Sequence, residues 1–271
     1  MSMPANTSDA TPQPGQATDV PDVPAQPPSR DAANWAGKVS RLQADPHSAA
    51  KGDNVTGRKL MGPVQGFGKM WQKTYSIDVG PTITPVQAIS AWKADFGSFW
   101  PKGNRFYGAL TGIAPGDVAL LDMSLPGGVR LSTGVMVLYA DDESFTLMTP
   151  QGHMFAGWIT NSAFERDGST IVQAQVLMRA NDPLYETGLM LGGHRKENRF
   201  WQDTLEALAA HLGVPSGQAV TDVVCVDKHR QWRRAGNLWH NAAIRSVLQM
   251  LLTPVRAVTR RGHRSSGDAR T

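Results

Sequence analysis

Few side chains in this sequence combine a type and a position suited to chemistry. The first is His153, which follows Gln151-Gly152 in a turn that joins two predicted strands. An imidazole titrates near neutral pH, so it acts as a general acid or base wherever a ligand lies against it. A solvent-exposed turn histidine without a role is the more common case. His153 is therefore a weak catalytic candidate, with no acid or base beside it in the sequence.

A second polar candidate is Asn161, which interrupts an otherwise apolar strand face. If that face points into the protein, the amide is a polar contact for a ligand carbonyl. The candidate ligand-binding residues surround it on neighbouring strands and on a long helix: Met136, Leu138, Phe155, Ile159, Asn161, Val172, Val176, Met178, Leu189 and Trp201. Val135 and Val137 are alternates for the first two, because a one-residue change of register exchanges the faces of a strand. An ordinary packed core explains the same apolar residues equally well.

Other motifs of enzyme chemistry are missing from the sequence. The seven histidines show no metal-ligand spacing with cysteine or carboxylate partners. There is no glycine fingerprint for a dinucleotide and no GxSxG elbow. The stretch 62–69, GPVQGFGK, resembles a phosphate loop, but its glycines are wrongly spaced and no Ser or Thr follows Lys69, so we interpret it as a turn. Cys225 lies in an apolar run and is expected to be buried. We expect no metal and no cofactor.

The elements that position these residues begin with strands. Period-two alternation predicts a first strand over 70–79 and six more over 105–111, 117–125, 129–140, 144–149, 154–166 and 169–180. Short links rich in Gly, Pro and Asp join the last six, so we expect a meander of antiparallel hairpins. Between the first strand and the rest, Thr84 and Gln87 form a capping box that opens a helix ending at Gly97.

A long helix over 181–213 follows the strands. Asp182-Pro183 is a start signal, and Gly213 is a stop signal. Trp201, Leu205, Leu208 and Leu212 recur at helical spacing, which predicts one buried face. Gly192-Gly193 interrupts the middle and weakens the helix there. His194, Arg195, Glu197 and Arg199 are interpreted as a solvated charged face.

Composition bounds the class of protein. At 271 residues, with 41% hydrophobic and 18% charged residues, the chain suits a globular core. A single cysteine forms no internal disulfide, the N-terminus has no secretory pattern, and no apolar run is long enough to span a membrane. We therefore expect a cytoplasmic protein, with peripheral membrane contact as an added option.

The charge is unevenly distributed. From Lys228 to the end there are ten Lys or Arg and one acid, a net charge of +9 against +4 overall, so the preceding residues carry −5. The sequence predicts an amphipathic basic helix over 229–258. Its candidate contacts to a membrane or another anionic partner are Arg230, Trp232, Arg233, Arg234, Trp239, Arg245 and Arg256. Packing on its own domain is the leading alternative, and phosphate contacts to nucleic acid are the weakest of the three.

Four segments result. Residues 1–30 carry seven prolines and form a predicted disordered leader. Residues 31–68 are a lead-in, 69–213 are the folded domain, and 214–271 are a basic amphipathic C-terminal extension. The expected class is α+β, with a seven-stranded antiparallel curved sheet wrapped around a long C-terminal helix.

The order strand, helix, short helix, six strands and long helix resembles the START-like helix-grip (SRPBCC) superfamily. The strand WQKTYSIDV, the strand GWITNSAFE and the helix RFWQDTLEALAAHLG look like those of its polyketide-cyclase-like bacterial members. The resemblance covers about residues 69–213. It implies a START-like ligand-binding domain with an apolar cavity between the sheet and the long helix.

Three functions follow from these interpretations. The preferred one is binding, and by extension transport, of a hydrophobic small molecule or lipid. The second is an enzyme, a polyketide cyclase or dehydratase in which a residue such as His153 moves protons. The third is a non-enzymatic interaction protein that acts through its basic C-terminal helix. Convergent polar groups in the interior would favour the enzyme, whereas a wholly apolar lining would favour the carrier.

Overall fold

The computed structural model describes residues 31–50, 52–108, 112–124 and 130–248. The chain divides into two units, residues 1–31 and 32–271. The predicted leader lies outside the described residues, as do 249–271.

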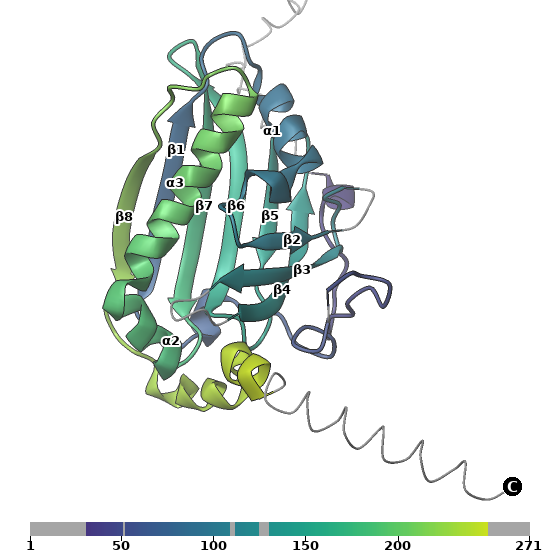
Figure 1. Cartoon of the computed structure of the whole chain (residues 1–271), viewed down its shortest axis with the longest axis vertical. Coiled ribbons are helices and arrows are strands. Elements are labelled where there is room, and N and C mark those ends of the chain that lie inside the picture. Colours follow the sequence, from purple (N-terminus) through teal and green to yellow (C-terminus); the bar gives the residue numbers. More distant parts are fainter. Residues whose placement is uncertain (1–30, 51, 109–111, 125–129, 249–271) are drawn as a thin grey trace, which may run out of the picture. The chain divides into compact units, whose positions relative to one another are not determined.

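One antiparallel sheet of eight strands forms the framework, in the order β2-β3-β4-β5-β6-β7-β1-β8 (Figure 1). The strands are β1 (Met70–Asp78), β2 (Arg105–Tyr107), β3 (Val118–Ser124), β4 (Arg130–Ala140), β5 (Ser144–Met148), β6 (Phe155–Arg166), β7 (Ser169–Ala180) and β8 (Val220–Asp227). The first seven match the predicted strands in order and nearly in bounds. The predicted meander is confirmed, because β2 to β7 are consecutive neighbours.

Helices cover one side of this sheet. They are α1 (Pro85–Ala94), the 3-10 helix η3 (Phe96–Phe99) and the long C-terminal helix α3 (His194–His211), which lies over β1 and β7 and runs roughly along them in Figure 1. Buried side chains from α1, η3 and α3 join those of the sheet in one cluster that includes Trp92, Phe96, Leu205 and Leu208. The expected α+β architecture of a curved antiparallel sheet against a long helix is therefore confirmed.

Local signals explain where the helices begin. Thr84 caps α1 by accepting the Gln87 N–H, and the Gln87 side chain returns a bond to Thr84, as a capping box requires. Asp182 caps α2 (Pro183–Gly188) by accepting the N–H groups of Leu184 and Tyr185. Both predicted start signals are confirmed.

The long helix is broken where the glycine pair interrupts it. Between α2 and α3 lies one π-helical turn, η5 (Leu189–Gly193), in which Leu191 and Gly192 leave helical geometry. Gly192 has φ of +115°, a conformation that costs little only for glycine. The predicted weak point is thus a sharp kink, and α3 starts anew at His194.

The lead-in covers the opposite side of the sheet. Leu42 and Val55 form a second buried cluster with Leu120 and Met136. The helices among its described residues are two short 3-10 helices, η1 (Ala32–Asn34) and η2 (Pro63–Gln65). The stretch 62–69 is packed rather than a loose turn, since a Cβ added at Gly66 would stand 2.8 Å from the Cβ of Arg179.

The C-terminal extension differs from the prediction in two ways. It adds β8, which pairs antiparallel with β1, so the sheet has eight strands rather than seven. The expected single amphipathic helix is wrong. Residues Trp232–His240 form a 3-10 helix, η6, which ends at Asn241, and a separate helical segment covers 242–248. Asn237 donates to the backbone oxygens of Gln65 and Asn181, so this part of the extension packs on its own domain.

Candidate functional site

The inner face of β1 carries the first polar groups of the site. Trp71, Lys73, Tyr75 and Ile77 alternate towards the helix side of the sheet. The Lys73 side chain is 1% exposed, which is unusual for lysine without a partner. A charge in this position demands compensation from the facing element.

The facing element is the first half of α3, which supplies that compensation. Glu197 and Asn198 lie one helical turn before Trp201 on the same stripe. The ammonium of Lys73 donates to Glu197 Oε2 at 2.6 Å and to Asn198 Oδ1 at 2.8 Å. The Tyr75 hydroxyl donates to Asn198 Oδ1 at 2.9 Å. We call Lys73, Tyr75, Glu197 and Asn198 the polar cluster.

Burial sets the protonation of the polar cluster. It raises the pKa of the Tyr75 hydroxyl, and the charge of Glu197 adds to the effect, so the phenol stays protonated. Burial also raises the pKa of Glu197, although the Lys73 charge opposes it. Lys73 and Glu197 form an ion pair of opposite charges, so together they carry no net charge. Such a cluster suits a neutral polar ligand group or a proton transfer, and not a bare anion.

His194 adjoins the polar cluster at the start of α3. Its ring packs edge-on against Trp71 with centroids 5.0 Å apart. Burial, then the charges of Lys73 and Lys69, lowers its pKa to about 4, so the imidazole is neutral at pH 7. Its Nδ1 stands 4.0 Å from Glu197 Oε2, beyond hydrogen-bond range, and has no partner among the described residues.

Asn161 lies on the same side of the sheet as the polar cluster. It alternates on β6 with Ile159 and Ala163, which both belong to the cluster of apolar side chains beneath the helices. In the sheet it pairs with Ala174, and Ala174 pairs with Tyr75, so only a small side chain separates the two polar residues. Asn161 is 0% exposed, and within the described part of the chain neither amide atom has a hydrogen-bond partner.

Close to β6, an indole N–H is likewise buried without a hydrogen-bond partner among the described residues. Trp92 on α1 packs edge-on against Phe145, with ring centroids 5.7 Å apart. Phe145 is the β5 partner of Asn161. The Trp92 Nε1 is buried and likewise unpartnered among the residues described. Native proteins rarely leave such groups unsatisfied, so each of these orphaned atoms calls for an explanation.

Most predicted ligand-binding residues are on the helix side of the sheet. Phe155, Ile159, Asn161, Val172, Val176, Met178 and Trp201 all face or pack against the cluster beneath α1 and α3, and Leu189 is buried in the kink. Met136 and Leu138 are placed wrongly by the prediction, because they pack in the second cluster on the opposite face. The alternates Val135 and Val137 face the helices. Contact of any of these residues with a ligand stays a prediction.

His153 is buried, contrary to an exposed turn histidine. Its Nδ1 accepts the N–H of Phe155 at 3.0 Å, and burial lowers its pKa to about 4. The neutral ring therefore has one nitrogen engaged by its own hairpin. Among the described residues, the hydrogen bonds and the ring contact of His153 go to Phe155 and not to the polar cluster, and its catalytic role stays a prediction.

The predicted anionic-partner residues lie in and around η6. Trp232, Arg233, Arg234 and Trp239 are exposed, whereas Arg230 is bound to Glu186 at 3.0 Å. Arg245 is half-buried in the following helical segment. Arg256 lies outside the described residues.

Sequence reasoning missed the polar cluster, although two signals pointed to it. Lys73 interrupts the apolar face of the first strand. On the long helix, stepping back from Trp201 by three and by seven residues gives Asn198 and His194 on the same stripe. The prediction of a solvated face is correct for Arg195 and Arg199 but wrong for Glu197, which is 8% exposed.

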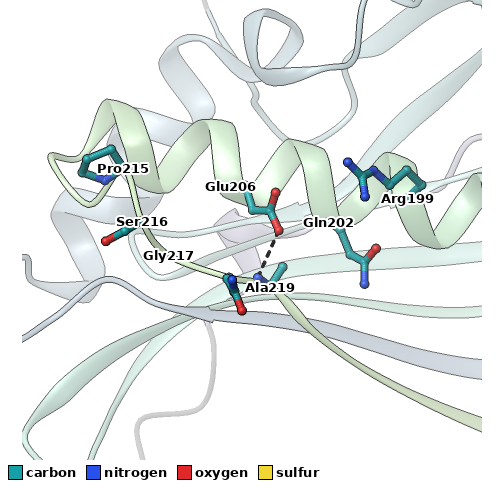
Figure 2. A pocket seen from close by; sticks show the side chains of 8 residues that line it. Arg199, Gln202, Glu206, Pro215, Ser216, Gly217 and Ala219 are labelled. Atoms are coloured by element: carbon teal, nitrogen blue, oxygen red, sulfur yellow. Dashed lines mark hydrogen bonds between the residues drawn. The ribbon is translucent and has the colours of Figure 1, made fainter.

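A separate hollow of about 410 Å³ lies at the rim, between α3 and the segment that leads into β8. Figure 2 shows Arg199, Gln202 and Glu206 of α3 around it, with Glu206 accepting the N–H of Ala219. Its lining is polar, and Arg199 is already paired with Asp203. This hollow is not the predicted apolar cavity, which stays a prediction. Among the described residues, no group of His, Cys, Asp and Glu could hold a metal ion.

The element order, the antiparallel meander and the long helix across its inner face decide the fold. The chain has a helix-grip fold. No family model matches the chain, and no curated protein matches it.

Solved structures of similar fold cover about half of the chain. Protein Ms6760 from Mycobacterium smegmatis is 15% identical over 52% of this chain and 90% of its own, with a TM-score of 0.39. StfQ, a di-domain ARO/CYC from the steffimycin biosynthetic pathway, is 9% identical over 54% and 52%, with a TM-score of 0.41. Major latex-like protein 151 from Panax ginseng is 11% identical over 53% and 98%, with a TM-score of 0.38. At these identities the similarity concerns the fold, and no function of these proteins is transferred to this chain.

Proposed function

We propose that the helix-grip domain binds a mainly apolar small molecule or lipid between the sheet and α3. The observation that carries the proposal is Asn161, whose buried amide has no partner in the described protein. Leaving such a group unpaired costs about 1–3 kcal/mol. A buried asparagine without a protein partner is therefore expected where a bound molecule supplies the hydrogen bond. A ligand carbonyl or hydroxyl in contact with Asn161 supplies that bond.

The surroundings of Asn161 define the ligand class. Ile159, Val172 and Val176 beside it are apolar, which suits a hydrocarbon or ring system. The polar cluster is charge-balanced and lies across Ala174, which suits a second neutral oxygen. We infer a ligand that is largely apolar and carries one or two neutral oxygen functions. Transport of such a ligand between surfaces is a further part of the proposal.

Two measurements test binding. Native mass spectrometry of the protein purified from its host should show a co-purifying lipid-like mass. Fluorescence titration with Nile red, a neutral apolar dye, should then give saturable binding that the extracted molecule displaces. Asn161→Leu should weaken binding of the extracted ligand, because the ligand oxygen loses its hydrogen-bond donor.

The neighbouring Thr160 offers the matched control. It lies on the opposite face of β6, where its hydroxyl bonds to Thr146 at 3.0 Å. Thr160→Val should leave ligand affinity unchanged. Absence of any co-purifying molecule, together with equal dye binding by wild type and Asn161→Leu, would reject the binding site.

A second candidate is an enzyme of the cyclase or dehydratase kind, and the polar cluster favours it. Glu197, with a raised pKa, is suited to take a proton from a carbon next to a carbonyl. The protonated Tyr75 is suited to donate a hydrogen bond to the carbonyl oxygen. Turnover of a β-keto thioester by the wild type, lost in Glu197→Gln and retained in His153→Asn, would support this role. Equal turnover by wild type and Glu197→Gln would exclude it.

A further inference from the structure

One end of the domain combines exposed apolar side chains with arginines. The helix η6 packs there beside α2, because Asn237 donates to Asn181 and Asn241 donates to Asp182 at 2.7 Å. In Figure 1 the yellow-green η6 runs beneath α2 at the same end of the sheet. We define the basic apolar face by Met190, Leu191, Trp232, Arg233, Arg234 and Trp239.

The apolar side chains of this face are unusually exposed. Leu191 is 83% exposed, Trp239 84% and Trp232 73%. Trp232 is held at one edge by Phe67, with ring centroids 5.2 Å apart, so its remaining surface is presented to solvent in a set position. Single exposed apolar residues need no explanation, but several on adjoining elements mark an interaction surface.

The backbone holds Leu191 outward. Leu189 is buried, whereas Leu191 sits at the non-helical point of η5, next to Gly192 at φ +115°. In an uninterrupted helix, residues 189 and 191 would point about 200° apart, and the chain would continue as a regular helix without a turn at this point. The kink instead makes Leu191 the tip of a turn.

The charge of the face has one sign. Residues 228–248 contain five Lys or Arg and no acid. Asp182 and Glu186, which bond to this segment, are buried, and Glu186 is paired with Arg230. Asp227, which precedes the segment, is half-buried and is paired with Arg179 and His229. Arg230 in turn reaches the Met190 sulfur at 3.2 Å, which joins η5 to the start of η6.

We propose that the basic apolar face docks the domain on the surface of a bilayer that contains anionic lipid. Tryptophan suits the boundary between headgroups and hydrocarbon, and the side chain of Leu191 suits the hydrocarbon below it. The arginines pair with lipid phosphates. A nucleic acid would pair with the arginines but offers no place for Met190 and Leu191. Among the described helices, none has the length and apolar character to cross a bilayer. The inference concerns the surface alone and does not depend on ligand binding.

Vesicle co-sedimentation of the full chain tests the proposal. The vesicles are phosphatidylcholine alone, or phosphatidylcholine with about one third phosphatidylglycerol to give an anionic surface. The wild type should sediment with the mixed vesicles and weakly or not at all with the neutral ones. Leu191→Ser/Trp239→Ser and Arg233→Glu/Arg234→Glu should each lower binding to mixed vesicles by at least about tenfold.

Control variants carry the same chemical changes elsewhere. Val220→Ser removes an exposed apolar side chain from β8, and Lys102→Glu/Arg166→Glu reverses two exposed charges. Both should bind like the wild type. Because all the altered residues are exposed, circular dichroism should show each variant folded.

Three outcomes would overturn the proposal. The wild type could fail to sediment with mixed vesicles, or both face variants could bind as it does. Alternatively, the face variants could lose binding to a DNA duplex, or lose self-association on size exclusion, without any change in vesicle binding. The last result would assign the face to nucleic acid or to a second copy.

Discussion

Lys73 on β1 and Glu197 on α3 form an ion pair of 2.6 Å in which both side chains are almost fully buried. The two residues are far apart in the chain, so this contact joins the sheet to the start of the long helix. Taking both charges out of water is costly, and the mutual attraction repays the cost only while both partners are present.

Removal of one partner should therefore be strongly destabilising. We expect Lys73→Met or Glu197→Gln to lower the free energy of unfolding by about 3–5 kcal/mol, and Lys73→Met/Glu197→Leu to recover much of the loss. Urea unfolding measures this. Arg199–Asp203, an exposed pair at 2.8 Å on the same helix, is the matched control, and Arg199→Met should cost less than about 1 kcal/mol. If Lys73→Met lowered the free energy of unfolding by as little as Arg199→Met does, the prediction would be contradicted.

The buried His153 should make stability fall in acid. Its pKa is about 4 in the folded protein against an ordinary value of 6.5, so between these values the unfolded chain binds more protons. Stability should decrease as pH falls from 6.5 to 4, by up to about 3 kcal/mol. His153→Asn keeps an acceptor for the Phe155 N–H but does not titrate. A slope of stability against pH that is the same in wild type and variant would show that His153 does not contribute.

Two glycines of the same helical region should respond oppositely to alanine. Gly188 is helical and has open space around it, so Gly188→Ala should raise the free energy of unfolding by about 0.4–1 kcal/mol. Gly192 has φ of +115°, so Gly192→Ala should lower it by about 1–2 kcal/mol. Thermal unfolding of the two variants checks the signs. Stabilisation by Gly192→Ala would mean that the kink is not held in solution.

The C-terminal extension should be part of the cooperative fold. Asn241 donates to Asp182, which is 0% exposed, and its side-chain oxygen accepts the N–H of Ile244. Asn241→Ala removes both bonds and leaves a buried carboxylate oxygen short of a donor, so we expect a loss of about 1–3 kcal/mol. Asn241→Asp should cost more, because it places a second carboxylate beside Asp182. Unfolding of 229–248 at lower denaturant than the sheet, seen by hydrogen exchange, would contradict this.

The parts of the fold that local signals determine were predictable. Period-two alternation and turn residues located β2 to β7, and capping residues located the starts of α1 and α2. The inward face of β4 was not predictable, because the register shifts between Val137 and Tyr139 and no sequence pattern shows such a bulge. β8 was missed because its role depends on the free edge of β1. η6 was misjudged because Gly236 weakens an α-helix there and Asn237 bonds to the domain instead.

The candidate site was predictable only in its apolar half. Alternation identified Ile159 and Asn161 on β6 and Val176 on β7, because both strands alternate regularly. The polar cluster depends on which side of α3 faces β1. The sequence did not show that side, because charged residues occur on both sides of the helix. Lys73 could have been recognised as an inward charge that needs a partner, but the sequence does not say which of the many acids provides it.

Asn161 offers the sharpest test of binding because stability and affinity should change in opposite directions. In the protein freed of ligand, Asn161→Leu replaces an unpaired buried amide by an apolar group of similar size, so it should raise the free energy of unfolding by about 1–3 kcal/mol. In the loaded protein the same change should weaken binding, because the ligand oxygen loses its donor. Stability after delipidation and affinity for the extracted ligand measure the two effects. A loss of stability without any change in affinity would mean that Asn161 serves the fold alone.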